Sequence, residues 1–469
     1  MQLLPTLKKK WVIASITALV LLILVAFVAY KKLSRFEISP RPTPNQTLLD
    51  DKALARNAWL PEVDKRWQQD VMSRHMPIRS LFSDDFSDLQ FLKTLLKDKR
   101  LVMLGENSHG VAEYSWMKAR LIRFLHREMG FDVLAFEGSM TGGYYVDKDI
   151  ADKTAVENLQ NAVFRTWWTE EVKDVFDYLK ATHEKGRTLT LAGFDIQNSS
   201  TLASTSAASL FKKMLAPLES PLLSQVDQSE KALSEAYSSQ SASVQDMNQV
   251  ASFYQHVVDA LVVNRSRLET MFVKEPSLVP LALQEAKSRI KLAEMQRLKT
   301  PDPKRSNDVR DAAMADNLSF LLDKMYPNRK FIVWAHNAHI GAGYPWWQAG
   351  LRDVKGMGAW IAEKRKSETY SIGLFMGRGG HVGDAQTRQV ITFYAPQPNS
   401  LEAILASANR KMSFVDFSQA RPTTGNEWIF SPISAKDWGT VPITFVPRNV
   451  FDAVLYIDDV TPPKYLGSK

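Results

Sequence analysis

The chain has 469 residues, of which 45% are hydrophobic and 23% charged, as is usual for a globular protein with one or two domains. Its formal charge of +8 comes mostly from residues 1–35, which hold six basic side chains and no acid. No basic run with interleaved aromatics follows, which argues against nucleic-acid binding. The absence of cysteine excludes disulfides, thiolate zinc sites and a cysteine nucleophile.

An uncharged apolar segment at 11–30 reads WVIASITALVLLILVAFVAY. Twenty such residues can cross a bilayer as a helix, with Trp11 and Tyr30 at its edges and lysines on both flanks. A cleaved signal peptide is the alternative, but its apolar region would be shorter, and Phe27 is a poor residue three positions before the best cut. We therefore expect a membrane anchor over 1–35 that contacts the lipid bilayer through this segment. The flanking charges weakly favour a domain outside the cytoplasm.

A proline-containing linker is expected at 36–50, and one large domain at 51–469. In that domain, strand-like and helix-like segments alternate. The strand-like runs lie at 100–105, 131–137, 187–195, 330–339, 368–380 and 451–458, and the main helical patterns lie at 86–98, 111–130, 170–186 and 307–326. Long helical patterns with Ser-rich breaks at about 203–297 predict an inserted helical subdomain. This alternation predicts an α/β fold with a mostly parallel central sheet flanked by helices.

Carboxylate or imidazole side chains stand at the ends of the first four strand-like runs. They are Glu106 with His109, Glu137, Asp195, and His336 with His339. The carboxyl ends of parallel strands meet at one edge of a sheet, where ligands bind, so we expect one shared site. Taken singly, these residues have ordinary explanations: Asp195 suits a helix N-cap, and His336 suits a core histidine. Three of the eight histidines lie at these ends, however, which favours a site.

Direct attack by water suits these residues better than a serine nucleophile. The string GENSHG lacks the GxSxG spacing, and Ser108 is adjacent to His109, which is a poor arrangement for a nucleophile and its base. A neutral imidazole can take a proton from water while Glu106 or Glu137 fixes its tautomer. A second histidine or Lys118 would then stabilise the developing oxyanion.

A metal site is the alternative chemistry. Glu106 and His109 have chelating spacing, as do His336 and His339, and two imidazoles with a carboxylate can hold a hydrolytic zinc ion. The second pair follows a strand, however, and is not the helical HExxH motif. We therefore expect no cofactor, with zinc or another divalent metal on these four residues as the alternative.

These motifs resemble the erythromycin esterase family. The family has a strand ending in Gly-Glu-x-x-His-Gly, then Glu and an aromatic residue on the next helix; this chain has Gly105 to Gly110, then Glu113 and Tyr114. Further shared motifs are Phe136-Glu137, Gly193-Phe194-Asp195-Ile196-Gln197, Arg310-Asp311 through Met314-Ala315 to Asn317, Trp334 to His339, and FDAVLYIDD at 451–459. They occur in order over roughly residues 85–460.

The resemblance implies an α/β hydrolase with a deep cleft that acts on a lactone or other ester. It assigns activation of water to His109, and further catalytic roles to Glu106, Glu137, Lys118, His336 and His339. Asp195 and Arg310 are expected to bind substrate. Characterised members are soluble and cytoplasmic, whereas we expect a single-pass protein of the bacterial inner membrane with a periplasmic domain. The substrate and the oligomeric state do not follow from the motifs, and an envelope protein that keeps the pocket only for binding is an alternative.

Aromatic residues near the proposed site form a predicted substrate wall. Tyr344, Trp346 and Trp347 follow His339, and Trp167 precedes the third strand. Such side chains would grip a bulky, partly apolar or sugar-bearing ester. The alternative is that they pack under a loop, because large aromatics are buried on average.

Overall fold

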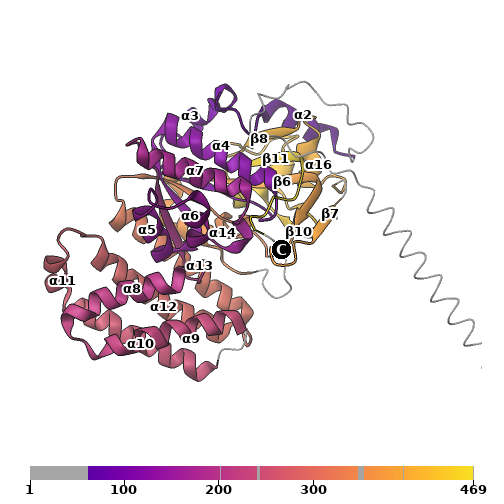
Figure 1. Ribbon diagram of the computed structural model, residues 1–469. Coiled ribbons are helices and arrows are strands. Elements are labelled where there is room, and N and C mark those ends of the chain that lie inside the picture. Colours follow the sequence, from indigo (N-terminus) through magenta and orange to yellow (C-terminus); the bar gives the residue numbers. More distant parts are fainter. Residues whose placement is uncertain (1–61, 201, 240–242, 347–352, 394–395, 468–469) are drawn as a thin grey trace, which may run out of the picture.

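The computed structural model describes residues 62–467, apart from residues 201, 240–242, 347–352 and 394–395 (Figure 1). The expected anchor at 1–35, its span at 11–30 and the linker at 36–50 lie outside the described residues. Within the described part of the chain, no helix is both long and apolar enough to cross a membrane.

A nine-stranded sheet forms the centre of the protein. Its strands are β1 (Met76–Pro77), β2 (Leu101–Leu104), β3 (Phe131–Ser139), β4 (Thr190–Asp195), β5 (Lys330–Trp334), β6 (Thr369–Val382), β7 (Val390–Phe393), β8 (Met412–Asp416) and β11 (Ala453–Val460). The order is β1-β8-β11-β6-β2-β5-β3-β4, and β7 pairs with β6. The six neighbours from β11 to β4 run parallel and are the six runs predicted from sequence. The prediction of a mostly parallel sheet is therefore confirmed.

Helices cover both faces of the sheet and bury a separate apolar core on each (Figure 1). One core contains residues of α3 (Phe91–Leu95), α4 (Ala112–Met129), α6 (Ala155–Ala162) and α7 (Glu170–Glu184). The other contains residues of α2 (Lys65–Arg74), α13 (Pro303–Phe320), α14 (Asn337–Ile340), α15 (Met357–Arg365), α16 (Leu401–Ala406), α17 (Glu427–Phe430) and α18 (Pro447–Val450). Burial on both faces explains why the parallel strands are continuously apolar, as in β2, all of whose residues are buried.

Five helices occupy the segment where the sequence predicted a helical insertion. They are α8 (Ala203–Leu215), α9 (Val226–Ser239), α10 (Val244–Val263), α11 (Arg265–Met271) and α12 (Leu278–Leu298). Figure 1 shows them together at one end of the molecule. Their apolar cluster continues into α13 and into α5 (Met140–Lys148). Inside it, Arg289 is buried between Glu230 at 2.8 Å and Glu285 at 2.9 Å, so an ion cluster ties α9 to α12.

A two-stranded antiparallel hairpin was not predicted from the sequence. It consists of β9 (Ile433–Asp437) and β10 (Val441–Phe445). The short antiparallel strands β1, β7 and β8 were also missed. Each has two to five residues, and its pairing joins segments that periodicity alone does not relate.

Candidate active site

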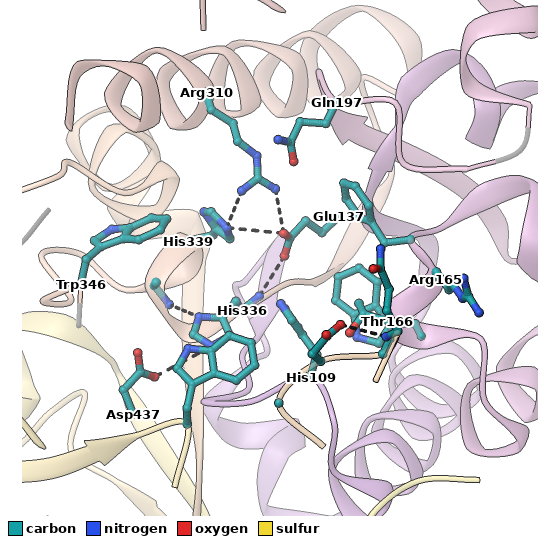
Figure 2. Close-up of a pocket in the computed structure, with 18 residues that line it drawn as sticks. His109, Glu137, Arg165, Thr166, Gln197, Arg310, His336, His339, Trp346 and Asp437 are labelled. Carbon is teal, nitrogen blue, oxygen red and sulfur yellow. Dashed lines mark hydrogen bonds and ion pairs between the residues drawn. The ribbon is translucent and has the colours of Figure 1, made fainter. Parts of the chain in front are cut away.

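The carboxyl ends of β2, β5, β3 and β4, which are neighbours in the sheet, bring four of the six predicted polar residues to one cavity, while Glu106 and Asp195 lie behind its wall (Figure 2). The cavity has a volume of about 480 Å³. The residues that follow these strands and line the cavity wall are His109, Glu137, Gln197, His336 and His339. Other segments complete the wall: residues 164–167, Arg310, Ala338, Trp346, residues 383–386, and Asp437 with Trp438. In the described residues, the helical insertion α8–α12 contributes nothing to this wall.

Glycines at both ends of GENSHG allow the loop after β2 to approach other backbone closely. A Cβ on Gly105 would lie 2.0 Å from Oδ1 of Asn337, and a Cβ on Gly110 would lie 1.9 Å from the carbonyl oxygen of Val382. Between them, the Asn107 amide donates to the carbonyl of Lys436 at 2.9 Å. The loop is therefore held against both α14 and the β9–β10 hairpin.

His109 and Glu106 form a hydrogen-bonded pair beside the cavity. Nδ1 of His109 donates to Oε1 of Glu106 at 2.7 Å, which leaves Nε2 as the basic nitrogen. Among the residues that the structure describes, this Nε2 has no hydrogen-bond partner, and the side chain lines the cavity with 18% of its surface exposed. Of the two carboxylates that the sequence offered, Glu106 and not Glu137 orients the imidazole.

Lys118 lies behind the cavity and neutralises Glu106. Its Nζ is 2.6 Å from Oε2 of Glu106, and both side chains are fully buried. Burial lowers the pKa of Lys118 to about 8, against the effect of Glu106. Burial alone would raise the pKa of Glu106, but Lys118 and His109 lower it below its usual value. The expected contact of Lys118 with an oxyanion is therefore corrected, because Lys118 does not reach the cavity and positions Glu106.

Glu137 and Arg310 form a second charged centre in the cavity wall. Nη2 of Arg310 is 2.9 Å from Glu137 and 2.5 Å from Asp195. The other oxygen of Glu137 accepts the backbone N–H of His336 at 3.1 Å. Asp195 is buried behind Arg310 and does not line the cavity, so its expected substrate contact is corrected to a positioning role.

His339 links this centre to a further buried acid, Asp311. Its Nδ1 is 2.8 Å from Asp311, while its Nε2 is 3.1 Å from Arg310 and 3.4 Å from Glu137. Burial alone would lower the pKa of His339, but the carboxylates of Asp311 and Glu137 raise it above its usual value. The protonated ring donates to Glu137, and the neutral ring accepts from Arg310.

His336 lines the cavity, and one of its ring nitrogens has no hydrogen-bond partner in the described residues. Its Nδ1 accepts the backbone N–H of Ala338 at 3.2 Å and caps the short helix α14. Burial, followed by the charges of His109 and His339, holds the pKa of His336 well below its usual value. The ring is therefore neutral, with its proton on Nε2, and this buried N–H has no hydrogen-bond partner in the described residues. A core histidine with satisfied nitrogens, the alternative from sequence, does not describe it.

Asp437 and Trp438, at the tip of the β9–β10 hairpin, are site residues that sequence reasoning missed. Both line the cavity, and Trp438 stacks on His336 with ring centroids 5.3 Å apart. They lie in the run KDWGT, between two five-residue strands that are too short for periodicity to reveal. The Trp-Gly pair was the available turn signal.

The aromatic residues predicted to bind substrate occupy different positions in the structure. Trp167 and Trp346 line the cavity, and the indole N–H of Trp167 also donates to Glu106 at 2.9 Å. Tyr344 is buried and does not line the cavity; its hydroxyl donates to Asp437 at 2.9 Å, so its expected substrate contact is corrected. Trp347 lies outside the described residues.

Ser108 has a histidine partner, but the pair is turned away from the cavity. Its hydroxyl is 2.8 Å from Nδ1 of His381, both residues are fully buried, and neither lines the cavity. Burial lowers the pKa of His381 to about 4, and its Nε2 has no partner in the described part of the chain. Without an orienting acid or access to substrate, the pair does not form a nucleophilic triad.

The four residues of the alternative metal site do not fit a cation. Both oxygens of Glu106 are taken, one by His109 and Trp167 and the other by Lys118. A guanidinium nitrogen of Arg310 stands 3.1 Å from Nε2 of His339, where it would repel a metal. Among the described residues, no group of three or more acids and histidines has the arrangement of a metal site.

Comparison with known proteins places this chain in a family. The sequence model described as erythromycin esterase matches residues 126–460. The chain belongs to the erythromycin esterase family. The match contains Glu137, Asp195, Arg310 and both strand-end histidines of β5, while Glu106 and His109 lie before it.

Relatives support both the family and its fold. The putative hydrolase YbfO of Bacillus subtilis is 31% identical over 414 residues, or 85% of this chain and 92% of that protein. Erythromycin esterase type II of Escherichia coli is 30% identical over 136 residues, or 28% of this chain and 32% of that one. A mutant of erythromycin esterase EreC in its open conformation superposes with a TM-score of 0.68 at 19% identity, covering 84% of this chain and all of that one. These relatives are named as hydrolases or esterases, and the chain shares the mixed α/β fold of erythromycin esterase EreC.

Proposed function

We propose that this protein is a metal-independent hydrolase in which His109 activates water to attack an ester or lactone carbonyl. The observation that carries the proposal is the His109–Glu106 pair, with Nδ1 committed to the carboxylate and Nε2 facing a cavity. Glu106 fixes the tautomer and stabilises the imidazolium that forms when the water loses its proton. Lys118 keeps Glu106 ionised, which maintains the pair.

His336 supplies the second function that the reaction needs. Its ring lines the cavity, its buried Nε2–H has no hydrogen-bond partner in the described residues, and the rings of His109 and His336 have centroids 5.1 Å apart. A carbonyl group in the cavity beside these two touching rings would receive the water on the His109 side and pass its negative charge to the N–H of His336. A preorganised donor of this kind is usually worth about 3 kcal/mol in the transition state.

An ester panel with the fragment that starts at residue 51 tests the proposal. The panel holds p-nitrophenyl acetate, δ-valerolactone and erythromycin, each assayed with and without EDTA. We expect turnover of at least one ester at a rate unaffected by EDTA. Loss of turnover with EDTA and recovery with zinc would contradict the metal-independent mechanism. No turnover, with binding of a ligand retained, would favour the non-catalytic pocket.

The aromatic wall suggests a bulky substrate. Trp346 is half-buried and contacts His339 edge-on with ring centroids 5.3 Å apart. We expect Trp346→Ala to raise KM for a large ester about tenfold, and for p-nitrophenyl acetate less than twofold. Trp360 packs on the same core but lies outside the cavity, so Trp360→Ala is the matched control. An equal rise in KM for both esters, with a large fall in Tm, would mean that Trp346 stabilises the core and does not bind substrate.

We also propose that residues 11–30 tether the hydrolase to the bacterial inner membrane with its domain in the periplasm. The uncharged length of this segment and its flanking lysines support the tether. The full chain should remain with membranes after an alkaline wash, and protease should reach the domain once the outer membrane is opened. A soluble product that begins near residue 30 would contradict the tether.

A further inference from the structure

The turn between β9 and β10 places a bulky residue in a backbone conformation that it rarely adopts. Trp438 has a φ of 50° and Gly439 a φ of 66°, and the N–H of Thr440 donates to the carbonyl of Asp437 at 3.2 Å. Two successive positive φ values are typical of a type I′ hairpin turn, which favours Asn and Gly over tryptophan. Such an unfavourable choice is found where the side chain has a task in a site.

The turn fixes the position of Asp437 relative to both catalytic histidines. The Trp438 indole stacks on His336 and meets His109 edge-on at a centroid distance of 5.3 Å. The backbone N–H of Trp438 donates to the carbonyl of Asn107 at 2.8 Å. Through these contacts, the hairpin tip is attached to the loop that carries His109. Figure 2 shows Asp437 beside the indole, at the cavity wall near His336.

Asp437 has one satisfied oxygen and one that is not. Oδ1 accepts the hydroxyl of Tyr344 at 2.9 Å, whereas Oδ2 is buried without a hydrogen-bond partner in the described residues. The unused Nε2 of His336 lies 3.9 Å from Oδ1. Buried polar atoms nearly always have partners, so two unpaired ones on neighbouring residues that both line the cavity point to a polar ligand at this part of its wall.

We propose that Asp437 is a further catalytic residue, the general acid that protonates the leaving alcohol oxygen of the ester. This inference rests on the proposed function and assigns a step that His109 would otherwise have to perform. The carbonyl oxygen lies at His336, and the ester oxygen at the unpaired Oδ2 of Asp437.

The reaction balances with these groups. His109 takes one proton from water as the water oxygen bonds to the carbonyl carbon, and the resulting oxyanion accepts the N–H of His336. The bond between the carbonyl carbon and the leaving oxygen then breaks, and the leaving oxygen receives the proton of the Asp437 carboxyl. Acid and alcohol depart, and solvent carries the proton on His109 back to Asp437, which restores both residues.

The surroundings of Asp437 keep the acid form available near neutral pH. Burial raises its pKa to about 7, against the lowering effects of the Tyr344 hydroxyl and the Trp438 N–H. The other titratable groups around it are His336, which is neutral, Tyr114 on α4, and Glu402 on α16. Because Asp437 must hold its proton to act, turnover that depends on it should decline as the pH rises above about 7.

Esters with different leaving groups test the assignment. In p-nitrophenyl acetate the leaving phenolate needs little protonation, whereas the alkoxide of δ-valerolactone needs it. We expect Asp437→Asn, which keeps the acceptor for Tyr344, to lower kcat/KM for the lactone about 10²-fold or more and for p-nitrophenyl acetate less than threefold. The alkaline decline of lactone turnover should disappear in this variant.

Glu402→Gln is the matched control. Glu402 is a buried carboxyl whose pKa burial also raises to about 7, but it does not line the cavity. Glu402→Gln should change kcat/KM for both esters by the same factor. Equal losses on both esters in a folded Asp437→Asn would overturn the general-acid role and leave the proposed function standing. A wild-type protein that hydrolyses neither ester would overturn the proposed function and this inference with it.

Discussion

Alanine in place of His109 is expected to lower kcat/KM for ester hydrolysis by about 10²–10⁴-fold, the usual contribution of a general base. The side chain is partly exposed and bonds only to Glu106 in the described residues, so Tm should fall by no more than a few degrees. The measurement is turnover of p-nitrophenyl acetate and δ-valerolactone, with Tm recorded for each variant.

Ser108→Ala is the control that separates His109 from its neighbour. Ser108 is buried, bonds to His381 and does not line the cavity, so its loss should leave turnover within a few-fold of wild type. The turnover of Glu106→Gln should lie between those of His109→Ala and Ser108→Ala. In this variant Nδ1 of the imidazole keeps an acceptor, but the charge that stabilises the imidazolium is lost. Normal turnover in a folded His109→Ala would remove His109 from its role.

Methionine in place of Arg310 is expected to lower the free energy of unfolding by about 3–5 kcal/mol, because it leaves buried acids without their cation. Arg310 contacts Glu137, Asp195 and His339 at once, and its side chain is 12% exposed. The measurement is urea unfolding at neutral pH, followed by two independent probes.

Two further variants show whether this loss comes from the buried charges. Lys212 pairs with Asp227 on the surface, where such pairs contribute about 1 kcal/mol or less, so Lys212→Met should be nearly neutral. Arg310→Lys keeps the charge but not the planar fork, and should recover part of the stability while turnover stays low. A small effect of Arg310→Met would mean that Glu137 and Asp195 find other partners or take up protons.

The parallel half of the fold was predictable because its determinants are local. Each of the six parallel strands is an apolar run, and Gly130 ends α4 in the left-handed conformation as its position predicted. The gathering of Glu106, His109, Glu137 and His336 followed from the rule that parallel strands end at one edge. The resemblance to the family reached the same residues through their motifs.

What the sequence did not reveal depends on contacts between distant segments. The hairpin that carries Asp437 meets Asn107 across 329 residues, and its strands are too short for periodicity to detect. Periodicity also cannot tell which layer a side chain occupies. Lys118 and Tyr344 were expected at the substrate and instead hold Glu106 and Asp437 from behind. Aromatic and basic residues near a site can either line the cavity or lie behind its wall, and only the packing determines which position they take.

Intact-mass analysis of the enzyme during turnover tests the central claim, direct attack by water that His109 activates. Samples of enzyme mixed with p-nitrophenyl acetate are quenched in acid from milliseconds to minutes and weighed. Water attack predicts the unmodified mass at every time, with no initial burst of p-nitrophenol. An adduct of one acetyl group that forms and decays at the rate of turnover would contradict the account, since it would show that a side chain, and not water, attacks the carbonyl.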